Sequence, residues 1–373
     1  MARLPRALPL PEFPWNTLEG ARLRAQAHPG GIVDLSVGTP VDDSPAVATQ
    51  ALAAAANSPG YPLTVGTAAV RQAICDWFAR RRSVPGLKPS QVIPTIGSKE
   101  AVALLPLLLG AAAGDTVLLP AMAYPTYDVG ARLVGATPIP VGDDPQQWPD
   151  ADLVWLNSPG NPHGHVLSVE QLRRIVAWAR RRGAMVVSDE CYAELAWEVD
   201  DVPSLLDPRV TDGDLTGLLA LYSLSKQSNL AGYRAALLAG DEAAVAAVVE
   251  TRKHLGLLVP GPVQAALVAA LGDDGHVDAQ REVYRRRRDA LVPAAKAAGM
   301  ELDPDSRAGL YLWGRVPGLS GRELVDRLAE LGILAAPGDF YGEQAAPYVR
   351  IALTASDERI DAAVERLAGA SLA

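Results

Sequence analysis

The feature that most constrains the fold is a repeated alternation, over residues 44–240, of an amphipathic helical pattern, a short apolar run and a turn containing Gly, Pro or Asn. This alternation is typical of βαβ units and predicts a mostly parallel sheet with helices on both faces. In the clearest unit, Ser168 and Gln171 have capping-box spacing, helical periodicity continues to Gly183, and a buried run ends at Asp189. The sequence therefore predicts an α/β fold.

Other apolar runs are expected to form strands of the same sheet. They are residues 117–119, 153–156, 218–224 and 235–239. In open α/β sheets, ligands bind outside the carboxyl ends of the strands, and polar residues follow several of these runs. We therefore expect the chemistry of the protein at this edge of the sheet.

A chain of 373 residues is long enough for two structural units. After a Pro-rich break at 260–262, long helical patterns continue to about residue 298. Strands expected at 311–313, 333–335 and 348–353 and a helix at 321–331 then indicate a smaller α+β unit, against which the first 40 residues are expected to pack. The predicted divisions are an N-terminal arm at 1–44, a large domain at 45–271 and a small domain at 272–373.

Charge and composition argue against several classes of partner. The formal charge of −9 disfavours a nucleic acid, which binds through Lys and Arg. Two cysteines are too few for a disulfide framework or a four-cysteine zinc site, and His163 and His165 have no further ligands at metal-site spacing. The apolar stretch 101–114 is shorter than the roughly 20 residues of a membrane span. We expect a cytoplasmic protein that binds no metal, nucleic acid or membrane.

Lysine is rare in this chain, which has 29 Arg and only five Lys. A lysine in a tight site therefore suggests chemistry that a guanidinium cannot perform, because only an amine loses its proton when desolvated and condenses with a carbonyl as a Schiff base. Lys226 is the candidate, since it follows the buried run 218–224 and should project at the ligand-binding edge. The alternative is a solvated lysine at a strand end.

Ser223 and Lys226 also have the S-x-x-K spacing of penicillin-binding proteins and class A β-lactamases. That class additionally needs K-T-G downstream and S-D-N after the nucleophile. No lysine here precedes a threonine, and the nearest related sequence, at 188–190, comes before Ser223. This reading is therefore disfavoured.

Several segments together resemble the class I/II pyridoxal-phosphate aminotransferases of fold type I. Their order and spacing match in Asn157–Gly164, Ser188–Tyr192, Ser223–Lys226 and Gly232–Arg234. The resemblance extends over nearly the whole chain, although His163 stands where the family usually has Thr. It implies a large domain with a mostly parallel sheet between helices, a smaller α+β domain, and pyridoxal 5'-phosphate as cofactor.

The resemblance also implies roles for individual residues. Lys226 would bind the cofactor as a Schiff base and then move the proton between the substrate Cα and the cofactor. Asp189 would pair with the pyridine nitrogen, the alternative being a helix N-cap. Asn161 and Tyr192 would hydrogen-bond the phenolic oxygen, and Tyr124 would stack on the ring unless it is an ordinary core residue.

Phosphate and substrate contacts are implied in the same way. Residues that would bind the phosphate are Gly97, Ser98, Lys99, Ser223, Ser225 and Arg234. Tyr61 would reach the phosphate from a second subunit, which implies a homodimer with shared active sites. Arg350 would hold the substrate α-carboxylate with a bidentate guanidinium, and Gly38 and Asn161 would lie beside that carboxylate.

Closer similarity, in segments such as 94–100, 225–234 and 336–342, is to bacterial N-succinyldiaminopimelate aminotransferases of lysine and diaminopimelate synthesis. It implies that N-succinyl-LL-2,6-diaminopimelate and 2-oxoglutarate give N-succinyl-2-amino-6-oxopimelate and glutamate. Lys99, Arg252 and Lys253 are candidates for the distal carboxylate. The alternatives are an aminotransferase for aspartate, alanine or unsuccinylated diaminopimelate, a carbon-sulfur lyase, and a cofactor-binding regulator, which would normally carry a DNA-binding module.

Overall fold

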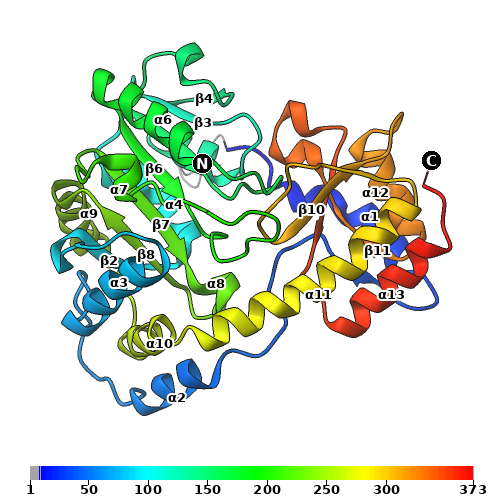
Figure 1. The fold of residues 1–373 in the computed structure, drawn as a ribbon, viewed down its shortest axis with the longest axis horizontal. Helices are drawn as coiled ribbons and strands as arrows, with labels where there is room; N and C mark the ends of the chain where they lie inside the picture. Colours follow the sequence, from blue (N-terminus) through cyan, green and yellow to red (C-terminus); the bar gives the residue numbers. More distant parts are fainter. Residues whose placement is uncertain (1–7, 9, 373) are drawn as a thin grey trace, which may run out of the picture.

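The computed structural model describes residue 8 and residues 10–372, and it has two lobes connected by the long helix α11 (Gly275–Ala297) (Figure 1). Residues 1–7 and 9 of the predicted N-terminal arm, and residue 373, lie outside the described residues. No helix in the described part of the chain is long and apolar enough to cross a membrane.

A seven-stranded sheet forms the centre of the larger lobe, in the order β2-β8-β7-β6-β5-β3-β4. Its strands are β2 (Val92–Ile96), β3 (Thr116–Pro120), β4 (Thr137–Val141), β5 (Leu153–Asn157), β6 (Met185–Asp189), β7 (Leu218–Ser223) and β8 (Ala235–Gly240). β8 runs antiparallel to both of its neighbours, and the other neighbouring pairs are parallel. The prediction of an α/β fold with a mostly parallel sheet is confirmed.

Helices cover both faces of this sheet. The helices of this lobe are α2 (Ala46–Ala54), α3 (Ala68–Arg81), α4 (Gly97–Leu108), α5 (Thr126–Leu133), α6 (Val169–Arg182), α7 (Pro208–Thr211), α8 (Leu224–Gln227), α9 (Glu242–Leu255) and α10 (Gly261–Leu271). Of these, α2 packs on α10, α7 packs on α6, and α8 follows the end of β7. Successive residues of β5 point to opposite faces of the sheet. Leu156 lies in a core cluster with residues of α6, whereas Trp155 lies in a cluster with residues of α4 and α5. The predicted capping box of Ser168 and Gln171 starts α6, and Gly183 ends it with a φ of 71°.

The smaller lobe contains a four-stranded antiparallel sheet in the order β12-β13-β10-β9. Its strands are β9 (Glu301–Leu302), β10 (Tyr311–Arg315), β12 (Ala336–Pro337) and β13 (Val349–Ala352). The helices of this lobe, besides part of α11, are α1 (Glu19–Gln26), α12 (Gly321–Glu330) and α13 (Asp357–Ala368). β1 (Val33–Asp34) pairs in parallel with β11 (Ile333–Leu334), and α1 contacts α12 and β11, so these two N-terminal elements lie against this lobe. The divisions at 44/45 and 271/272 stay predictions.

The strand before Lys226 ends one residue earlier than the sequence predicts. The apolar run 218–224 suggests strand through Leu224, but β7 ends at Ser223. The Ser223 side chain accepts a hydrogen bond from the Ser225 amide and caps α8, which turns the chain at the edge of the sheet. This turn places Lys226 on a short helix at the carboxyl end of β7.

Candidate active site

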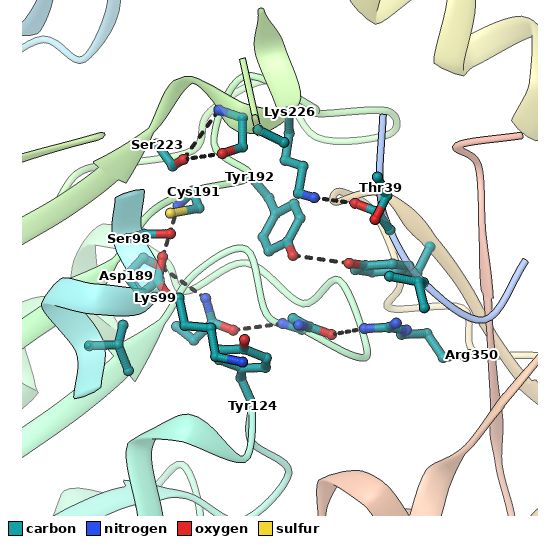
Figure 2. Close-up of a pocket in the computed structure, with 18 of the residues that line it drawn as sticks. Thr39, Ser98, Lys99, Tyr124, Asp189, Cys191, Tyr192, Ser223, Lys226 and Arg350 are labelled. Carbon is teal, nitrogen blue, oxygen red and sulfur yellow. Dashed lines mark hydrogen bonds between the residues drawn. The ribbon is translucent and has the colours of Figure 1, made fainter. Parts of the chain in front are cut away.

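A cavity of about 500 Å³ lies at the carboxyl ends of β5, β6 and β7, and residues of β10 and β13 from the smaller lobe complete its wall. Among the residues predicted for the site, those lining the cavity are Gly38, Ser98, Lys99, Tyr124, Asn161, Asp189, Tyr192, Ser223, Ser225, Lys226, Arg234 and Arg350. Figure 2 shows Lys226, Asp189 and Arg350 approaching this space from three different sides. The fold thus brings together residues that are far apart in the sequence.

Lys226 projects from α8 into the cavity. Its amine donates a hydrogen bond to the carbonyl oxygen of Gly38. Burial lowers the pKa of the Lys226 amine below its usual 10.5, and the nearby cations Arg350 and Arg234 act in the same direction. A lowered pKa favours the neutral amine, which is the form that attacks a carbonyl carbon.

Asp189 ends β6 and is buried beside the cavity. Its carboxylate accepts hydrogen bonds from the Tyr127 hydroxyl at 2.9 Å and from the Cys191 amide at 3.1 Å. Burial raises the pKa of Asp189, and these donors oppose the rise because they stabilise the anion. Tyr127 is stacked on Trp155, with the ring centres 5.0 Å apart, which fixes the direction of its hydroxyl.

A cradle of donors lies at the start of α4, where the first backbone N–H groups have no partner within the helix. Gly97 has a φ of 72°, and a side chain there would collide with the guanidinium of Arg234. Arg234 itself has a φ of 58°, a conformation that non-glycine residues adopt mainly where the surroundings enforce it. The Ser223 hydroxyl donates to that of Ser225 at 2.8 Å. This group of donors fits a phosphate dianion.

Arg350 lies on β13 and is 2% exposed. Its guanidinium donates to Asn161 Oδ1 and to the Ser36 carbonyl oxygen, both at 2.8 Å. The guanidinium carbon lies 3.9 Å from the ring centre of Tyr311, and the Nε hydrogen has no partner among the described residues. A buried cation with unused donors fits a carboxylate ligand.

The Tyr192 hydroxyl lies 3.1 Å from that of Tyr311. Burial raises the pKa of Tyr192 well above 10, so this hydroxyl keeps its proton. Tyr124 and Phe13 line another part of the wall, and the Lys99 amine lies 6.0 Å and 5.3 Å from the centres of their rings. No carboxylate of the described residues forms an ion pair with Lys99.

Two predicted residues do not line the cavity. Gly97 lies behind the Arg234 guanidinium, and Arg234 itself lines the cavity. Tyr61 is 97% exposed in the single chain. Of the other candidates for a distal carboxylate, Arg252 is buried against Glu100 at 2.8 Å and Lys253 pairs with Glu250 at 2.5 Å, and neither reaches the cavity.

Two residues that contact the predicted site, Tyr127 and Tyr311, were not predicted from the sequence. Tyr127 lies three residues after Tyr124, in the first turn of α5. This closeness to a predicted site residue is the sequence signal that could have identified it. In the described part of the chain, no group of three or more His, Cys, Asp or Glu side chains is arranged to hold a metal ion. His165 instead pairs with Asp303 at 2.8 Å.

Comparison with known proteins agrees with this geometry. Residues 31–367 match the family model for aminotransferase class I and II. The chain is 54% identical over 359 residues to the probable aminotransferase Rv1178 of Mycobacterium tuberculosis, covering 96% of this chain and 85% of that one. It is 52% identical over 364 residues to the 4-dedimethylamino-4-oxo-anhydrotetracycline transaminase OxyQ of Streptomyces rimosus, covering 96% and 99%.

A solved structure described as a probable N-succinyldiaminopimelate aminotransferase, from Thermus thermophilus, superposes with a TM-score of 0.85 at 31% identity, covering 95% of this chain and 99% of that one. The fold is that of the fold type I enzymes, and the matched family uses pyridoxal phosphate to act on amino and oxo acids. These findings exclude the β-lactamase-like reading of Ser223 and Lys226. This chain belongs to the class I and II aminotransferases.

Proposed function

We propose that the cavity binds pyridoxal phosphate through Lys226 and transfers an amino group between an amino acid and an oxo acid. One observation carries this proposal: the Lys226 amine, the Asp189 carboxylate and the Arg350 guanidinium face the same cavity. An amine that attacks an aldehyde, an anion for the pyridine nitrogen and a cation for a substrate carboxylate are the groups that this reaction requires.

The residues present fit the cofactor. The lowered pKa of Lys226 suits attack on the aldehyde, and the donors at Gly97, Ser225 and Arg234 suit its phosphate. Asp189 is buried without a cation partner among the described residues, so a protonated pyridine nitrogen would neutralise it. When bound, pyridoxal phosphate supplies an aldehyde for the substrate amine and a ring that accepts electrons from Cα.

The residues of the chain divide the work of the reaction. Arg350 binds the substrate α-carboxylate and fixes the plane of the amino acid, which selects the Cα–H bond for cleavage. With a substrate amine bound in the site, the Lys226 amine would accept the proton from Cα as general base and, as general acid, deliver it to the C4′ carbon of the cofactor. Asp189 would hold the proton on the pyridine nitrogen, and Tyr192 and Asn161 would donate hydrogen bonds to the phenolic oxygen.

For the substrate, we propose N-succinyl-LL-2,6-diaminopimelate with 2-oxoglutarate as acceptor. This substrate carries carboxylates far from the reacting carbon, and the cavity offers Lys99 as a cation without a carboxylate partner among the described residues. Arg22 also lines the cavity, paired with Asp34 at 2.8 Å, and both side chains are 34% exposed. The similarity to the Thermus thermophilus protein supports the same assignment.

A second candidate substrate is a bulky cyclic ketone. The cavity has an aromatic lining that includes Phe13, Trp15 and Tyr124. OxyQ, which is 52% identical to this chain, is described as a 4-dedimethylamino-4-oxo-anhydrotetracycline transaminase. Aromatic side chains bind flat rings by stacking. This candidate predicts activity that survives the loss of the Lys99 charge.

We also propose a homodimer located in the cytoplasm. In the single chain, Tyr61 is 97% exposed and Leu63 is 64% exposed, and an interface with a second copy would cover them. Light scattering of Tyr61→Ala and of the unchanged protein would measure whether this segment contributes to a dimer.

A panel of oxo acids tests the substrate assignment. Glutamate is the donor, and the acceptors are N-succinyl-2-amino-6-oxopimelate, oxaloacetate, pyruvate, unsuccinylated 2-amino-6-oxopimelate and an anhydrotetracycline ketone. We expect the highest kcat/KM for the succinylated acceptor, and Lys99→Met should reduce that value more than the value for pyruvate. A preference for another acceptor contradicts the substrate, and release of pyruvate from cystathionine without an acceptor indicates a carbon-sulfur lyase.

A further inference from the structure

The cavity contains a pair of tyrosine hydroxyls that the family chemistry above does not fully use. The Oη atoms of Tyr192 and Tyr311 are 3.1 Å apart, so one of the two hydroxyls donates to the other. The rings meet edge to face, with centres 5.7 Å apart. Tyr192 comes from the chain after β6, whereas Tyr311 begins β10 in the smaller lobe.

Close packing holds the Tyr311 side chain in place. It is 5% exposed, and its ring lies against the Arg350 guanidinium at 3.9 Å. A Cβ at Gly38 would overlap the Tyr311 hydroxyl, so a larger residue there would displace the Tyr311 side chain. The carbonyl oxygen of the same glycine accepts the hydrogen bond from Lys226. Tyr311 therefore contacts the backbone and side chains that shape the reacting end of the cavity.

The direction of the hydrogen bond decides what Tyr192 can do. Each hydroxyl carries one proton. If Tyr192 donated to Tyr311, its proton would point away from the cofactor and could not reach the phenolic oxygen. If Tyr311 donates, the Tyr192 proton is free to point into the cavity, and accepting a hydrogen bond makes Tyr192 a stronger donor.

We propose that Tyr311 is a positioning residue, which donates its hydroxyl proton to Tyr192 and so directs the Tyr192 proton to the phenolic oxygen of the bound cofactor. This inference rests on the proposed role of Tyr192. The ring of Tyr311 has a separate effect, because it packs against Arg350 and helps to fix the carboxylate-binding guanidinium. Removing the hydroxyl alone and removing the whole ring therefore have different consequences.

The charged and titratable groups that face the pair come from several elements. Arg350 on β13, Lys226 on α8, Cys191 after β6 and Tyr341 all lie close enough to influence Tyr192, Tyr311 or the cofactor linkage. The experiment compares variants that keep all four of these groups. Differences between the variants then report on the hydroxyl pair.

The test uses the purified holoenzyme and the pH midpoint of the visible absorbance of the cofactor bound to Lys226. Negative charge on the phenolic oxygen stabilises the protonated Schiff base on Lys226, and a hydrogen bond to that oxygen weakens this stabilisation. Tyr192→Phe removes the hydrogen bond, so it should raise the pH midpoint at which the Schiff base loses its proton. Tyr311→Phe should raise it by a smaller amount, about 0.3 pH unit, because cooperative strengthening is only a fraction of one hydrogen bond. The double variant should match Tyr192→Phe alone, because Tyr311 acts through Tyr192.

Two further measurements separate the hydroxyl from the ring. The apoprotein of Tyr311→Phe should bind pyridoxal phosphate more weakly than the unchanged apoprotein, whereas its KM for glutamate should stay unchanged. Tyr311→Leu should raise that KM, because the ring against Arg350 is lost. Tyr348→Phe removes a hydroxyl from a ring that stacks on Trp313 outside the cavity, and it should leave the midpoint unchanged.

The outcomes distinguish this inference from the proposed function. A midpoint that moves in Tyr192→Phe but not in Tyr311→Phe overturns the role of Tyr311 alone. Additive shifts in the double variant also overturn it, because the two hydroxyls would then act independently. An unchanged midpoint in Tyr192→Phe overturns the role of Tyr192, and the absence of any visible band in the unchanged protein overturns the proposed function itself.

Discussion

Replacing Arg350 with lysine tests how the cavity recognises its substrates. Two of the guanidinium nitrogens already bond to Asn161 and Ser36, which fixes the plane of the group. A lysine keeps the positive charge but loses the planar, two-pronged contact with a carboxylate. Losing one charge-assisted hydrogen bond, worth about 1.5–3 kcal/mol, predicts a decrease in kcat/KM of roughly 10- to 150-fold for Arg350→Lys.

The assay follows the absorbance change of the bound cofactor when an amino donor is mixed with the enzyme in the absence of any oxo acid. Glutamate, alanine and aspartate are compared, because the α-carboxylate is common to all three. The decrease should therefore be similar for each donor. Arg315→Lys is the matched control, since Arg315 lies on β10, is paired with Glu301 at 3.3 Å and does not line the cavity. A decrease confined to one donor would instead place Arg350 at the distal end of the substrate.

Other variants test the remaining parts of the site. Asp189→Asn should lower the rate of α-proton removal by more than tenfold while the apoprotein stays folded, because an amide cannot hold the pyridine nitrogen protonated; an unchanged rate in rapid mixing would refute this. Tyr127→Phe removes a hydrogen bond to a buried carboxylate and should destabilise the apoprotein by about 1.5–3 kcal/mol in urea titrations, and equal midpoints would show that the bond contributes nothing. Burial lowers the pKa of Lys226, so its charged form destabilises the folded apoprotein, and this penalty decreases as the pH rises toward 10.5. Lys226→Met should therefore raise the melting temperature of the apoprotein most at low pH, and a gain that increased with pH would contradict the assigned direction.

Much of the fold and site could be predicted because the signals are local. The alternation of helical and apolar segments indicated the strands that end at Asp189 and Ser223, and the carboxyl ends of such strands lie at one edge of a parallel sheet. The rarity of lysine indicates Lys226 independently of any resemblance to a family. The motif order then extended the set to residues of the smaller lobe, such as Arg350.

The rest depends on contacts between distant segments. Tyr127 has the pattern of an ordinary core residue, and only the stacking on Trp155 and the bond to Asp189 distinguish it. Tyr311 is separated from Tyr192 by more than a hundred residues, so no spacing rule could pair their hydroxyls. Arg252 was a candidate for the distal carboxylate because its charge is visible in the sequence, whereas its burial against Glu100 is not.

The most direct test of the central claim is to find where the cofactor is attached. The native protein is treated with borohydride, which reduces a Schiff base to a stable secondary amine, and is then digested and analysed by mass spectrometry. We predict one pyridoxyl adduct, on the peptide that contains Lys226. An adduct on Lys99 or another lysine, or no adduct in protein that retains activity, would contradict the account.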